Sequence, residues 1–186
     1  MNYTQESVLN TSDKTTLTMI FNDTISFLKH ISVPKAISYL RCIPDQCQMH
    51  YVSLENRKKR NEHSKKYHPI KPKRGEIYNA YITEGVGSEL CGNHLVIIIQ
   101  NKKGNIYSDK VNVLPIEGNG NNINSNYQLR LSSSDLQDGF LSKDPSRIIL
   151  TDITTIDKAR LGRRIGQLKP EYLLEIGKCL KAQLEI

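Results

Sequence analysis

The chain has 186 residues, a length typical of one domain or of a smaller domain with an appendage. It contains no stretch of about 18 consecutive apolar residues, which excludes a membrane-spanning helix. The formal net charge is +7, and the segment from Arg57 to Arg74 holds nine basic residues and a single acid, Glu62. Such a segment indicates an anionic partner, most commonly nucleic acid, or else a solvated helix face or linker.

The four cysteines show no CxxC spacing, and the first ten residues, MNYTQESVLN, lack the basic and apolar regions of a secretion signal. We therefore expect reduced thiols in a cytoplasmic protein that has no membrane contact. The histidines are irregularly spaced and lie among many lysines, so we assign no metal site and no cofactor.

The first part of the chain carries a helical pattern. Apolar residues at helical spacing predict a helix from Asp13 to Ile31, with Ser12 available as its N-cap. A second, short helix is predicted around Pro34–Arg41, and Pro44 is expected to break it and to open a third helix. We expect residues 1–68 to form a helical N-terminal extension. It either enlarges a binding surface or packs on the rest of the chain or on a partner.

Residues 69–72, with two prolines, read as a linker, and a β pattern follows from residue 73 to 186. The five apolar residues Leu95–Ile99 predict a central strand that is buried on both faces. A terminal amphipathic helix is predicted at Pro170–Leu184. The other predicted strands are Glu76–Glu84, Lys110–Ile116, Tyr127–Leu131 and Arg147–Thr151. This pattern favours an α+β protein with a small barrel or curled sheet.

The loop ahead of the central strand is polar and contains several glycines. It presents Ser88, Glu89, Asn93 and His94 beside a rigid strand, which is a plausible place for a functional site. The alternative is a hairpin loop that only leads into a core strand.

The second half of the chain resembles the MazF/PemK family of toxins, the ribonucleases of bacterial toxin–antitoxin pairs. The shared motifs, in order, are KRGEIY at 73–78, GSELCG at 87–92, VIIIQN at 96–101 and TIDKARL at 155–161, followed by the terminal helix. The resemblance implies an SH3-like barrel with a C-terminal helix, usually as a homodimer. It also implies a cognate antitoxin and metal-independent cleavage of single-stranded RNA, such as mRNA, in a groove between subunits.

The chain departs from the family at three places. Where the family usually has Arg-Pro before the central strand, this chain has His94-Leu95. Where a threonine or serine commonly follows the third strand, it has Glu117. Near the last strand the family favours Gln-x-Arg-Thr-x-Asp, and residues 152–157 read DITTID, without the arginine. The residues 57–74 are basic, so they do not resemble the acidic tail by which an antitoxin would cover an RNA groove.

Cleavage of RNA through its own 2′-OH requires a base, an acid and a cation or donor for the phosphorane. Residue type and the alignment to the family suggest His94 and Glu117 as the acid–base pair of an altered active site. The alternative is a catalytically inactive MazF-like module that binds RNA or protein. The expected RNA-binding residues are Arg74, Ser88, Glu89, Asn93, Lys102 and Lys103.

Overall fold

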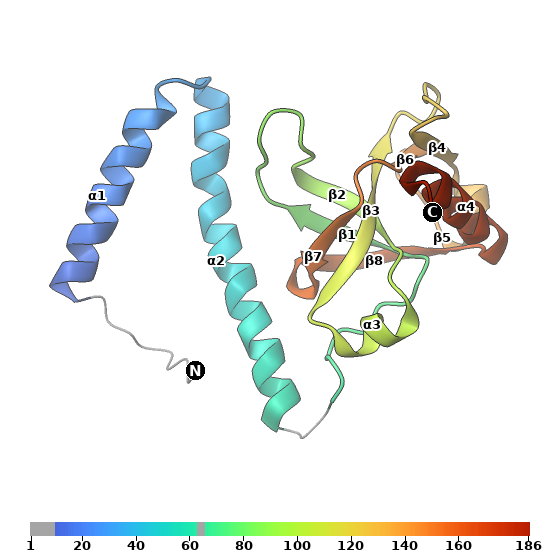
Figure 1. Ribbon diagram of the computed structural model, residues 1–186, viewed down its shortest axis with the longest axis horizontal. Helices are drawn as coiled ribbons and strands as arrows, with labels where there is room; N and C mark the ends of the chain where they lie inside the picture. The colour runs from blue at the N-terminus through green and yellow to red at the C-terminus, as the bar shows by residue number, and fades with distance from the viewer. Residues whose placement is uncertain (1–9, 63–65) are drawn as a thin grey trace. The chain divides into compact units, whose positions relative to one another are not determined.

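The computed structural model describes residues 10–62 and 66–186 (Figure 1). The chain divides into two compact units, Met1–Ile43 and Pro44–Ile186. The helices are α1 (Thr11–Leu28), α2 (Val33–Glu62), α3 (Lys102–Tyr107) and α4 (Pro170–Leu184). Among the described residues, no helix is long and apolar enough to cross a membrane.

The helix predicted near the start of the chain is confirmed as α1, with a different N-cap. Asn10 caps the helix, because its side-chain oxygen accepts from the Asp13 backbone N–H at 2.8 Å. The Asp13 carboxylate accepts from the Asn10 N–H in return, which forms a capping box. Ser12, the expected cap, lies inside the first turn.

The prediction that Pro44 ends one helix and opens another is wrong. Helix α2 runs without interruption from Val33 to Glu62 and contains Pro44. A proline inside a helix removes one backbone hydrogen bond and costs about 3 kcal/mol. Contacts that are distant in sequence help to offset this cost: Ser53 donates to Asp157 at 2.9 Å, and Arg60 lies 3.0 Å from Asp109.

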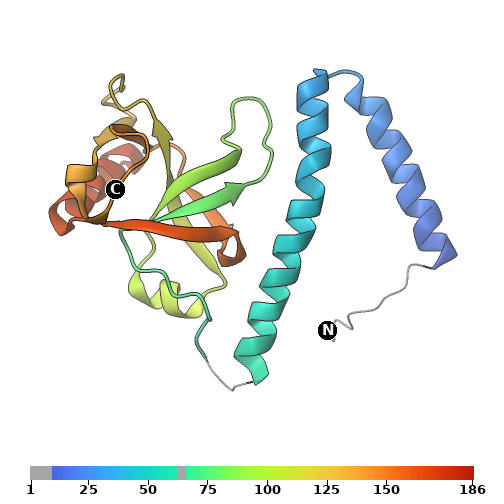
Figure 2. The ribbon, with the colours of Figure 1, turned by 180° about the vertical axis from the view of Figure 1, so that it is seen from behind.

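The described residues from 76 to 168 form a strongly curled antiparallel sheet of eight strands (Figures 1 and 2). The strands are β1 (Glu76–Ile82), β2 (Gly92–Ile98), β3 (Lys110–Gly118), β4 (Gln128–Leu131), β5 (Leu136–Gly139), β6 (Ser146–Ile149), β7 (Thr154–Asp157) and β8 (Leu161–Leu168). Their order is β4-β6-β3-β2-β1-β8-β5, and β7 pairs with the first half of β3. The predicted α+β fold with a small curled sheet and a C-terminal helix is confirmed.

Strand β2 is the central strand, and its predicted burial on both faces is confirmed. Ile97 belongs to one hydrophobic cluster, whereas Val96 and Ile98 belong to another, and all three side chains are fully buried. Since successive side chains of a strand point to opposite faces, β2 fills the core on both sides. Helix α4 closes the first cluster with Ile176, which is 1% exposed.

Lys158 lies fully buried beside the sheet, in a polar cluster. Its Nζ donates to the Asn105 carbonyl at 2.7 Å. Burial lowers the pKa of Lys158 to about 8, against the opposing effect of the nearby Asp109 and Asp157 carboxylates. The same two carboxylates bind Arg60 and Ser53 of α2, so this cluster joins the second part of α2 to the sheet.

We predict that Lys158 makes the stability of the protein depend on pH in the alkaline range. Its pKa is about 8 in the folded chain and 10.5 as an ordinary lysine, so between these values the unfolded chain binds the additional proton. The free energy of unfolding therefore rises with pH in this window. Urea unfolding of the wild type and of Lys158→Met from pH 7 to pH 10 measures the effect. As the pH rises, the free energy of unfolding of the wild type should increase relative to that of Lys158→Met. Parallel pH profiles of the two proteins would contradict this account.

Candidate active site

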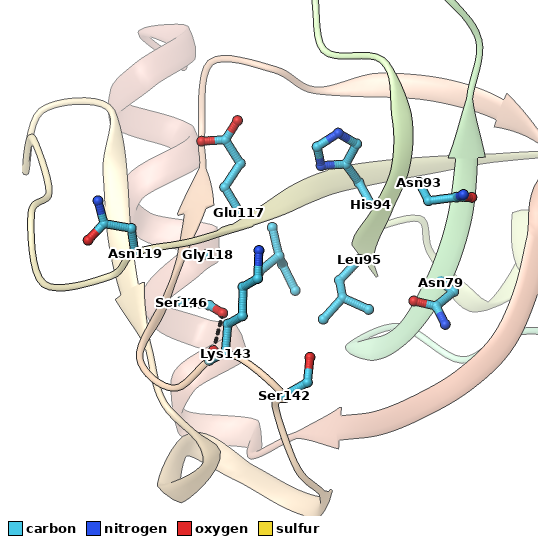
Figure 3. A pocket seen from close by; sticks show the side chains of 11 residues that line it. Asn79, Asn93, His94, Leu95, Glu117, Gly118, Asn119, Ser142, Lys143 and Ser146 are labelled. Carbon is cyan, nitrogen blue, oxygen red and sulfur yellow. Dashed lines mark hydrogen bonds between the residues drawn. The ribbon is translucent and has the colours of Figure 1, made fainter.

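A pocket of about 670 Å³ opens where β2 begins and β3 ends (Figure 3). Leu95 and Ile116, which pair across β2 and β3, contribute apolar surface to it. The side chains that carry chemistry are His94, Glu117 and Lys143. The remaining polar lining consists of Asn79, Asn93, Asn119, Ser142 and Ser146.

His94 lies on β2 with its ring half-buried. Its Nε2 lies 2.8 Å from the Cys91 carbonyl oxygen. A carbonyl only accepts, so Nε2 carries the hydrogen, and Nδ1 of the neutral ring is the acceptor. If the ring takes up a proton, Nδ1 becomes a donor while the bond to Cys91 persists. The Cys91 carbonyl therefore orients the ring and leaves Nδ1 for chemistry.

Glu117 lies near the end of β3, directly opposite Arg147 of β6. Arg147 donates through Nε at 3.1 Å and through Nη2 at 2.7 Å, and both bonds reach the same carboxylate oxygen, Oε2. A further Arg147 nitrogen, Nη1, donates to the Asn122 carbonyl at 3.3 Å. This arrangement holds the carboxylate in place by one oxygen and leaves Oε1 as a second acceptor at the pocket.

Lys143 comes from the loop between β5 and β6 and extends over Gly118 into the pocket (Figure 3). A Cβ atom at Gly118 would lie only 2.5 Å from the Cδ of Lys143. Any residue larger than glycine at this position therefore displaces the lysine stem. The backbone at Gly118 needs no special conformation, so the glycine matters here for space.

The structure brings Asn93, His94 and Glu117 of the predicted site residues to one pocket. The side chains of His94 and Glu117 point to the same side of their strands (Figure 3). Cys91 holds the His94 ring, and Arg147 holds the Glu117 carboxylate. Among the described residues, no group of three or more His, Cys, Asp or Glu side chains could hold a metal ion.

The other predicted RNA-binding residues lie elsewhere. Ser88 and Glu89 line a second pocket of about 560 Å³, where the Glu89 carboxylate accepts from the Val86 N–H at 2.8 Å and shapes the loop. Arg74 is exposed just ahead of β1. Lys102 and Lys103 are exposed on α3, at the opposite end of the β2–β3 hairpin from His94.

Sequence reasoning missed two cations of the site, Lys143 and Arg147. Arg147 was placed correctly in a strand, but only the register of β6 against β3 reveals its partner Glu117. Lys143 lies in a polar loop, where the sequence has no helical or strand pattern from which the direction of the side chain could be predicted. An imidazole, a carboxylate and an ammonium group around one pocket can together transfer protons and bind an anion.

The part of the chain that carries this pocket is similar to known proteins. Residues 73–184 match the family described as PemK-like, MazF-like toxin of type II toxin–antitoxin system. A protein named endoribonuclease MazF, from Staphylococcus saprophyticus, is 34% identical over 112 residues, which cover 60% of this chain and 90% of that protein.

Solved structures resemble the same part of the chain. The crystal structure of MazF from Deinococcus radiodurans is 14% identical, with a TM-score of 0.51, and covers 62% of this chain and 97% of that one. An endoribonuclease from a mycobacterial species, solved in complex with its cognate antitoxin, is 19% identical with a TM-score of 0.46. It covers 62% of this chain and 95% of its own.

We predict that the Glu117–Arg147 pair contributes measurably to stability. The two side chains are about 30% and 26% exposed, so solvent screens them only in part. A double-mutant cycle with Glu117→Gln and Arg147→Met, followed by urea unfolding, should give a coupling energy of about 0.5–1 kcal/mol. In 1 M salt the coupling should fall. A coupling indistinguishable from zero at low salt would show that the pair does not hold the carboxylate.

Proposed function

Because the chain belongs to the PemK-like, MazF-like toxin family of type II toxin–antitoxin systems, we propose that it is the toxin of such a pair. In this proposal it is an endoribonuclease that cleaves single-stranded RNA without a metal, at an altered active site. The observation that carries the proposal is that His94, Glu117 and Lys143 all line one pocket. The alignment with endoribonuclease MazF over 90% of that protein supports it.

The pocket suits a phosphodiester because Lys143 places a positive charge in it. The ammonium group neutralises the scissile phosphate and the further negative charge that develops on the phosphorane. Lys143 thus takes the place of the arginine that the family usually carries where this chain has His94. Asn93 and Asn119 offer further hydrogen bonds to the RNA at the same rim.

The two titratable groups divide the proton transfers. Glu117 Oε1 takes the proton from the ribose 2′-OH, and the 2′-oxygen attacks phosphorus. His94, as the imidazolium, gives its Nδ1 proton to the leaving 5′-oxygen while its Nε2–H stays bonded to Cys91. The O2′–P bond forms and the P–O5′ bond breaks, which yields a 2′,3′-cyclic phosphate and a 5′-hydroxyl.

We predict that Glu117→Gln and His94→Ala each lower the cleavage rate at least about 100-fold, the usual contribution of a positioned acid or base. The assay is full-length protein with a labelled single-stranded RNA in the presence of chelator, with the product ends identified. The wild type should give cyclic phosphate ends. RNA binding with no products would favour the non-cleaving module, and variants as fast as the wild type would remove both residues from the mechanism.

We predict that Gly118→Ala reduces cleavage by displacing Lys143, at little cost in stability. The three atoms nearest to the added methyl all belong to the flexible side chain of Lys143. Lys143→Gln should lower the rate similarly, and the combination of both changes should lower it no further. Gly177→Ala on α4 is the matched control, since nothing lies within 4 Å of its added Cβ. Full activity of Gly118→Ala, with Lys143→Gln impaired, would show that the lysine acts from another position.

The assignment extends to partners and to the organisation of the chain. The family description implies a cognate antitoxin, and the family resemblance implies a homodimer that acts in the cytoplasm. Residues 73–186 form the barrel domain that carries the activity, which the family match over 73–184 supports. We propose residues 1–68 as the helical extension, of which the structure describes residues 10–62 and 66–68, and residues 69–72 as the linker.

A further inference from the structure

Two exposed tyrosines meet at the end of the β2–β3 hairpin that is remote from the pocket. Tyr67 precedes β1, and Tyr107 is the last residue of α3. Their ring centroids lie 5.4 Å apart with an interplanar angle of 39°. They are 47% and 41% exposed, so both rings present aromatic surface to solvent.

The backbone holds these rings in place from both sides. The N–H of the buried His68 donates to the Ile106 carbonyl at 2.9 Å, which fixes the segment after Tyr67 to α3. Arg60 donates to the Tyr107 carbonyl at 3.2 Å. The rings therefore lie on a supported surface, which reduces the entropy lost when a ligand stacks on them.

The surroundings of the rings are positively charged. The Nζ of Lys71 lies 4.9 Å from the centroid of the Tyr67 ring. Lys103 and Tyr107 line a shallow groove of about 470 Å³. The nearby carboxylate of Asp109 is engaged by Arg57 at 3.2 Å and by Arg60 at 3.0 Å, so it does not neutralise the lysines.

We propose that Tyr67, Tyr107, Lys71 and Lys103 form a second binding site for single-stranded RNA, the tyrosine platform. Unpaired bases stack on exposed aromatic rings, and lysines beside the rings neutralise the flanking phosphates. A duplex hides the faces of its bases, so this combination selects a single strand. This second site extends the proposed function and rests on it, because the platform would hold the same RNA that the pocket cleaves.

The platform and the pocket contact different parts of one RNA. From His94 to the end of β2 at Ile98, the strand rises about 13 Å at about 3.3 Å per residue, and the platform lies beyond that end. That rise alone corresponds to about four stacked nucleotides at about 3.4 Å each. The platform therefore contributes to the binding of long RNA and adds nothing to a fragment that fills only the pocket.

The test measures binding of a fluorescent 2′-O-methyl oligoadenylate of about sixteen nucleotides to the full-length chain. The blocked 2′-oxygen prevents cleavage, so binding is read independently of catalysis. The combined variant Tyr67→Leu/Tyr107→Leu should lose about tenfold or more in affinity, and Tyr67→Phe/Tyr107→Phe should bind like the wild type. Tyr127→Leu is the matched control, because Tyr127 is also 47% exposed but lies just ahead of β4.

The contribution of the two lysines is measured separately, through the salt dependence of binding. Lys71→Gln/Lys103→Gln should weaken binding and reduce the slope of log affinity against log salt by about 1.4, or about 0.7 for each lost phosphate contact. Unchanged affinity of the leucine variant, or an equal loss with Tyr127→Leu, would overturn the platform. Circular dichroism confirms folding of each variant, and the phenylalanine variant separates loss of stacking from loss of structure. Tyrosine-dependent binding without cleavage would support the platform and refute the nuclease proposal.

Discussion

The register of β3 between β2 and β6 is the constraint on which the candidate active site depends. Leu95 pairs with Ile116, and Ile116 pairs with Ile148, in two adjacent antiparallel ladders. A slip of one residue would turn every side chain of β3 to the opposite face. Because Ile116 and Ile148 are almost fully buried, such a slip would expose the core, and the cost of that exposure fixes Glu117 opposite Arg147.

The same register gives the Glu117 carboxylate its partner. Without a partner, Glu117 would be an isolated charge at the rim of the pocket. Arg147 supplies that partner from the neighbouring strand, through two N–H groups to one carboxylate oxygen. Lys143, which extends over Gly118, supplies positive charge from a different loop. Glu117 thus has a cation on the neighbouring strand, and Lys143 lines the same pocket as Glu117 from a different loop.

Much of the fold was predictable because its strongest signals are local. The apolar run around Val96–Ile98 predicted the central strand, and the proline at residue 170 with its amphipathic pattern predicted α4 to the residue. Strand β8 was missed because arginines at 163 and 164 interrupt its alternation, and their solvent-exposed positions become clear only beside β1. Strands β5 and β7 have four residues each, which is too short for an alternation of apolar and polar residues to be recognised in the sequence. The sequence around Pro44 does not display the contacts that help to hold α2, such as the hydrogen bond from Ser53 to Asp157, 104 positions away.

The residues of the candidate site likewise divide into those that the sequence identified and those that only the tertiary fold reveals. Residue type and alignment identified His94 and Glu117 as candidates, and the structure places both at one pocket, although their catalytic roles stay a prediction. The tertiary fold brings Lys143 to that pocket and Arg147 to Glu117, and a single sequence does not display either contact. The tyrosine platform likewise joins residues 67 and 107, which are forty positions apart and belong to no common motif.

The most direct test of the account is a structure of the full-length chain with a short single-stranded RNA that carries a 2′-deoxy sugar at the cleavage position. The absent hydroxyl prevents the attack and traps the complex. The account predicts a phosphate within hydrogen-bond distance of Lys143 Nζ, with the 2′ carbon facing Glu117 and the 5′-oxygen facing Nδ1 of His94. RNA bound elsewhere, with its backbone outside this pocket, would contradict it.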